Sequence, residues 1–84
     1  MEKYRPGVSW LEPAMYRICI QGILEESRSD YYGGMAIEHE RVPHRYAVTI
    51  LTGRLADQSA LVGILNSLHD SGCPILSVER MEAG

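Results

Sequence analysis

The sequence predicts an α+β sandwich, in which a four-stranded antiparallel sheet packs against one full helix and one much shorter helix. Two kinds of pattern lead to this prediction. Four segments either alternate apolar with polar residues or are rich in β-branched residues, and we expect them to be strands: 15–24, 35–42, 46–55 and 75–81. Apolar residues recur at helical spacing in one segment, which follows Asp57.

The first predicted strand has one apolar face and one mixed face. In MYRICIQGIL (15–24), Tyr16, Ile18 and Ile20 fall on the same side of an extended chain. Cys19 and Ile23 fall on the other side, among polar neighbours. Because this second side is not fully polar, we expect another surface to cover part of it.

The segment that follows is the truncated helix. EESRSDYYGG (25–34) is too short for an amphipathic helix, and a serine in it caps at most a single turn that contains Tyr31 and Tyr32. Residues 35–42 then alternate as a half-exposed or edge strand does, with Met35 and Ile37 on the same side. A turn is expected at 43–45.

The second half of the chain predicts a strand, a helix and a last strand. YAVTILTGRL (46–55) is rich in β-branched residues. Asp57 is a good N-cap for a helix of about 14 residues, and Gly72 is suited to end it. The buried stripe of this helix is expected to consist of Leu61, Ile64, Leu65 and Leu68.

The predicted order is βαββαβ, that of a ferredoxin-like sandwich with a truncated first helix. We assign 1–14 to an N-terminal arm and 15–84 to the domain. One helix covers about half of the apolar face of four strands, so we expect a homo-oligomer, most simply a dimer. The expected interface residues are Trp10, Cys19, Ile23, Tyr31 and Tyr32. The tyrosine pair has an alternative role, which is to fill the sheet face of its own chain.

Composition narrows the function classes. The 84 residues carry a formal net charge of −3, which does not favour nucleic acid as a partner. The single lysine, Lys3, excludes a P-loop and a buried Schiff-base lysine. The sequence has no apolar stretch of membrane-spanning length and no signal-peptide pattern, so a cytoplasmic protein is expected. No cofactor is expected. Its two cysteines are expected to be free thiols.

The stretch VTILTGRLADQSALVGILNSLHDSGCPILSVERM resembles the strand–helix–strand unit of ACT regulatory domains, in which amino acids or other small effectors bind near the strand–helix junction. The resemblance implies a site at Gly53, Asp57 and Gln58, with Arg54 beside it to offset the charge of the aspartate. The residues themselves favour a strand–helix connection that binds no ligand, in which Gly53 forms a bend at the end of the strand. Residues 16–81 also resemble uncharacterised small bacterial proteins with QG-x-L, G-x-L-x-DQ-x-AL and LSV motifs.

Together these observations favour a non-enzymatic homo-oligomer that serves as an interaction module or as a small effector-binding module. One alternative is a small cofactor-free enzyme of the dimeric α+β barrel type, with a histidine or tyrosine as the acid or base. Another is a metal-binding protein that uses His39 and His44, which a hairpin would bring close together. We assign no catalytic residue and no metal ligand.

Overall fold

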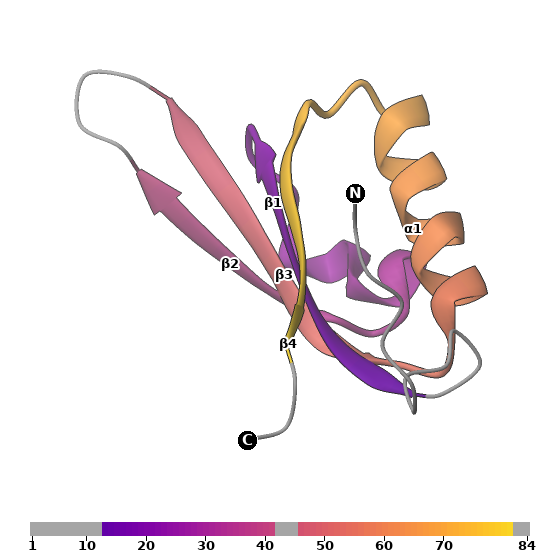
Figure 1. Ribbon diagram of the computed structural model, residues 1–84. Coiled ribbons are helices and arrows are strands. Elements are labelled where there is room, and N and C mark those ends of the chain that lie inside the picture. Colours follow the sequence, from indigo (N-terminus) through magenta and orange to yellow (C-terminus); the bar gives the residue numbers. More distant parts are fainter. Residues whose placement is uncertain (1–12, 42–45, 82–84) are drawn as a thin grey trace, which may run out of the picture.

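The elements of the chain follow one another in the order strand, short helix, strand, strand, helix, strand (Figure 1). The structure is a computed structural model that describes residues 13–41 and 46–81. The elements are β1 (Ala14–Gln21), the 3₁₀ helix η1 (Glu26–Tyr32), β2 (Ala36–Arg41), β3 (Ala47–Leu55), α1 (Gln58–Asp70) and β4 (Ile75–Met81). The sheet thus begins at Ala14, inside the segment expected to be an arm, whereas residues 1–12 lie outside the described residues.

The four strands form one antiparallel sheet in the order β2-β3-β1-β4. Strands β1 and β3 pair in the centre, and β2 and β4 are the two edges. Because every neighbouring pair is antiparallel, β1 runs parallel to β2 with β3 between them. For the same reason β3 runs parallel to β4 with β1 between them.

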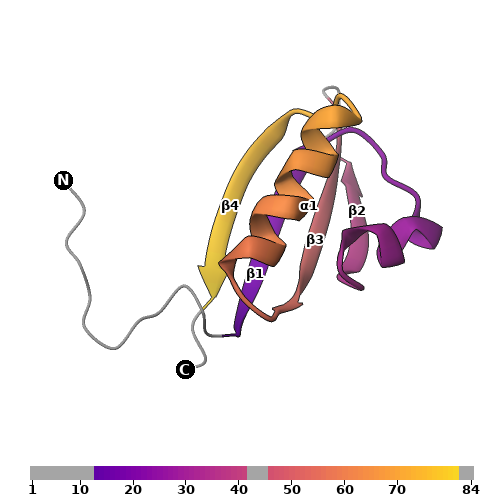
Figure 2. The same ribbon diagram turned by 90° about the vertical axis from the view of Figure 1, so that its right-hand side faces the viewer.

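The core lies between the central strands and α1. The residues of β1 that alternate toward α1 are buried, as predicted, and Ile18 and Ile20 are fully shielded from solvent. We call this side of the sheet the inner face and the opposite side the outer face. Seen from the helix side, α1 lies over the centre of the sheet and η1 lies in front of β2 (Figure 2). Three residues of α1 are buried against the sheet: Leu61, Ile64 and Leu68.

The stripe of α1 is narrower than its spacing predicts, since Leu65 is only partly buried. The caps agree with the sequence. The Asp57 carboxylate accepts a hydrogen bond from the backbone N–H of Ala60 at 2.9 Å, and Gly72 follows the helix with a φ of 77°. Glycine has no Cβ to oppose such a left-handed conformation, so it ends the helix without a steric penalty.

The short helix η1 fills the inner face beside α1 with one side chain, that of Tyr32, which is 2% exposed. Gly33 follows it, with a φ of 67°. A Cβ on Gly33 would lie 3.1 Å from the terminal methyl carbons of Ile64 and Leu55. The glycine therefore lets η1, α1 and β3 meet closely at one point of the core.

A single hydroxyl group fixes the connection between β1 and η1. Thr49, on the inner face of β3, is fully buried. Its Oγ1 donates to the carbonyl oxygen of Gly22 at 2.7 Å and accepts from the N–H of Leu24 at 3.0 Å. His39 Nε2 is also hydrogen-bonded to the carbonyl oxygen of Leu24. The chain leaving β1 is thus fastened across two other strands of the sheet.

We predict that Thr49→Val destabilises the fold by about 2–4 kcal/mol, because valine keeps the shape but leaves two backbone groups without their hydrogen bonds. Thr49→Ser keeps the hydroxyl and should cost about 1 kcal/mol for the lost methyl group. Urea unfolding followed by circular dichroism measures both. Equal losses for the two variants would contradict this role of the hydroxyl.

Candidate functional site

The strand–helix junction contains the four residues expected to bind a ligand, and the structure gives two of them a structural task. Gly53 lies within β3 and is not a bend: a Cβ there would be 3.1 Å from Cα and Cγ of Met35, so the glycine permits close packing of the chain. Asp57 caps α1 through Ala60. Both residue types are thus explained without a ligand.

The other two junction residues, Arg54 and Gln58, are exposed. Arg54 follows Gly53 in β3, so their positions alternate between the two faces of the sheet. Gln58 is the first residue of α1 and is exposed. A ligand at this junction stays a prediction.

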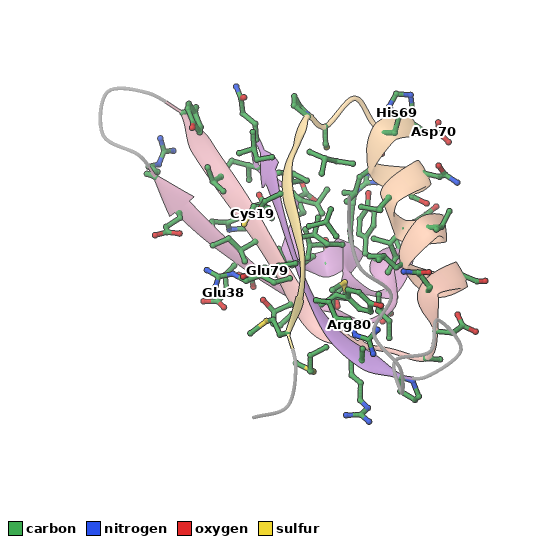
Figure 3. All side chains as sticks on the ribbon, in the orientation of Figure 1. Cys19, Glu38, His69, Asp70, Glu79 and Arg80 are labelled. Atoms are coloured by element: carbon green, nitrogen blue, oxygen red, sulfur yellow. The ribbon has the colours of Figure 1, made fainter. Side chains whose placement is uncertain are left out.

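The expected interface residues lie in three different environments. Tyr31 and Ile23 are 75% and 56% exposed. Tyr32 is buried in the core of its own chain, so one tyrosine of the pair, and not both, has the alternative role. Cys19 is partly exposed on the outer face, on the side of the sheet away from α1 (Figure 3). Trp10 lies outside the described residues.

The outer face of the sheet has an open hollow of about 510 Å³ over its centre. Ile50 and Thr52 of β3 line it together with Arg17 of β1. Glu38 and Glu40 of β2 also line it, so basic and acidic groups surround an apolar and hydroxyl-bearing centre. Figure 3 shows Glu38 and Glu79 on this side of the sheet. The sequence predicted the mixed character of this face but not the hollow, which residues of all four strands line together.

The edge strand β4 is the feature that the sequence did not single out. Its apolar side chains are all substantially exposed: Ile75 by 39%, Leu76 by 46%, Val78 by 43% and Met81 by 38%. Val78 is the register partner of Ile18 and so shares the inner face with it, yet Ile18 is fully buried. We call the surface made by these four exposed side chains the β4 edge.

An arginine on the inner face of β4 reaches toward the helix side (Figure 3). Arg80 is the register partner of Tyr16, whose side chain is buried. The Nε atom of Arg80 is itself buried and has no hydrogen-bond partner among the described residues. Because an unpaired buried donor costs free energy, this end of the inner face is suited to receive an acceptor.

The residues considered for catalysis or metal binding are dispersed. His39 holds the Leu24 carbonyl oxygen, and His69 lies in the last turn of α1, where the helix dipole favours a cation. Both cysteines are free. Within residues 13–41 and 46–81, no group of three or more metal-ligating side chains comes together. His44 lies outside this part of the chain.

No helix among the described residues is long and apolar enough to span a membrane.

We predict opposite outcomes for alanine at two glycines. Gly53→Ala should destabilise the fold by about 1–3 kcal/mol, because the added methyl group meets Met35. Gly63→Ala should stabilise it by about 1 kcal/mol, since the exposed site in α1 has nothing within 4 Å and alanine favours helix. Thermal unfolding gives both signs. A neutral Gly53→Ala would show that Gly53 is kept for a reason other than packing.

Comparison with known proteins gives a family and no function. Among curated proteins and among solved structures nothing matches the chain. One family model matches residues 15–79, which include all the described helices and nearly all of the sheet, and its description is a domain of unknown function. This agrees with the resemblance of residues 16–81 to uncharacterised proteins, while the ACT-like resemblance stays a prediction. The chain belongs to the family described as Domain of unknown function (DUF8691).

Proposed function

We propose that this protein is a non-enzymatic module of ferredoxin-like fold that works as a homo-oligomer, most simply a dimer, in the cytoplasm. The observation that carries the proposal is the incomplete cover of the inner face. Ile18 is fully buried, whereas its neighbour Val78 in the next strand is 43% exposed on the same face. A second chain is the simplest source of the missing contacts.

Two arguments support the fold and the compartment. In a ferredoxin-like sandwich each strand–helix–strand unit encloses a strand of the other unit, and the order β2-β3-β1-β4 has this arrangement. The first helix is then reduced to η1. Free thiols persist in a reducing compartment, and Cys19 and Cys73 are both free.

Other contacts support a role in binding rather than in catalysis. A catalytic acid or base needs a reacting group within hydrogen-bond reach. His39 instead uses Nε2 to hold a backbone carbonyl oxygen, and Asp57 uses its carboxylate to cap α1. These polar side chains therefore serve the fold.

We predict that the protein sediments at twice its monomer mass of 9.4 kDa at micromolar concentration. The physical reason is that the exposed apolar side chains of β4 gain more by contact with another chain than by contact with water. Sedimentation equilibrium at several concentrations measures the mass and the dissociation constant. A folded species of monomer mass throughout that range would overturn the proposal.

A small effector is a second candidate function, and the hollow on the outer face favours it. Arg17 offers a guanidinium group suited to a carboxylate. Glu38 and Glu40 lie across the hollow and are suited to an ammonium group, and Ile50 offers an apolar contact. The chemistry fits a zwitterionic amino acid with an apolar side chain.

We predict that one of the common apolar amino acids at ten times its dissociation constant stabilises the fold by about 1.4 kcal/mol, or about 5–10 °C in melting temperature. Arg17→Ala should abolish this shift, whereas Asp57→Ser, which keeps a cap for α1, should leave it intact. The reverse result would place the ligand at the strand–helix junction. If none of the common apolar amino acids shifts the melting temperature, this class of effector is excluded.

A further inference from the structure

We infer that the dimer forms by antiparallel pairing of β4 with β4 of a second copy of this chain, so that the two sheets join into one of eight strands. The inference rests on the proposed homo-oligomer and names its surface. It starts from the fact that β4 is an edge strand whose residues are exposed, apart from the partly buried Arg80. An edge strand has unpaired backbone donors and acceptors, which another strand satisfies.

The two edges of the sheet differ in the way that this inference requires. β2 has the sequence AIEHER, and its exposed residues include Glu38, Glu40 and Arg41. Charged side chains on an edge oppose the approach of another strand. β4 has the sequence ILSVERM and exposes four apolar side chains. The apolar edge is therefore the one suited to pairing.

The side chains of β4 select one register. In an antiparallel pair, residues directly opposite each other share a face, so inner residues must meet inner residues. With Val78 opposite the partner's Val78, this condition holds for Ser77, Val78 and Glu79. Ser77 then lies opposite the partner's Glu79, whereas Leu76 and Ile75, at the bulge, lie opposite the partner's Arg80 and Met81 without this match of faces. The regular pairing therefore covers Ser77–Glu79 of each strand, about 10 Å.

The neighbouring registers are worse for physical reasons. A shift by two residues in one direction places Glu79 opposite the partner's Glu79, and like charges there repel each other. A shift by two in the other direction brings Pro74 opposite the partner's Arg80, and proline has no N–H for the ladder. A shift by one residue would put inner residues opposite outer ones. The bulge of β4, opposite Cys19 and Ile20, leaves Ser77–Met81 regular.

Symmetry favours a second copy of this chain over pairing of β4 with another edge. Pairing β4 with β2 of another copy would be head-to-tail, which leads to a ring or an open fibre rather than to a dimer. Pairing β4 with β4 places a two-fold axis at Val78 and closes after two chains. In the joined sheet, both α1 helices lie on the same side, and the two β4 strands lie in the part of the sheet between them.

The register gives a sharp test, because residue 78 faces itself across the axis. Sedimentation equilibrium is run on the wild type, V78K, V78E and an equal mixture of the two variants. Each variant alone should raise the dimer dissociation constant at least about tenfold, through like charges directly opposite each other. The mixture should restore dimers, since lysine then faces glutamate. V62K is the matched control, because Val62 is 50% exposed on α1 and is outside the paired strand.

Each outcome has a separate meaning, with thermal unfolding used to check that every variant is folded. A wild-type monomer overturns both the proposed function and this inference. A dimer that survives in V78K and V78E keeps the proposed function and overturns the pairing through β4. Separate monomers that fail to pair when mixed overturn the register. Loss of the dimer in V62K as well would place the interface on α1 instead of the strand edge.

Discussion

The fold depends on one requirement, which is that a helix of 13 residues has to keep water from the inner face of the sheet. The helix meets this requirement over the centre, where Ile18, Ile20 and Leu51 are fully buried. η1 adds one tyrosine beside it. Beyond that cover, β4 remains accessible. The position of the helix over the central strands (Figure 2) therefore decides which part of the sheet is a core and which part is a surface.

The local patterns of the sequence predicted the elements well, because those patterns depend on neighbours in the chain. Alternation placed Tyr16, Ile18 and Ile20 on the buried face, and Asp57 marked the start of α1. The predicted four-stranded antiparallel sheet with one full helix is confirmed. The first strand ends at Gln21, earlier than alternation predicts, because Gly22 and Leu24 are held by Thr49 from β3. Such a contact has no local signal.

The surfaces were harder to predict for a related reason. A period of two tells which residues share a face, but it does not tell which strand lies at an edge of the sheet. Val78 has the pattern of a core residue and is nevertheless exposed, because β1 and not β4 lies under the middle of α1. The hollow on the outer face likewise combines residues of all four strands, among them Arg17, Glu38, Ile50 and Met81. At the junction, the glycine and the aspartate that suggested a ligand have roles in packing and capping.

The hydroxyl group of Thr49 has a consequence for the order in which the chain acquires its shape. Thr49 lies 25 residues after Leu24, and its hydroxyl oxygen accepts a hydrogen bond from the N–H of Leu24. In addition, β3 lies between β1 and β2 in the sheet. During synthesis, the first strand and η1 leave the ribosome before the residue that fastens them. The amino-terminal half therefore has no finished form of its own, and its assembly waits for the arrival of β3.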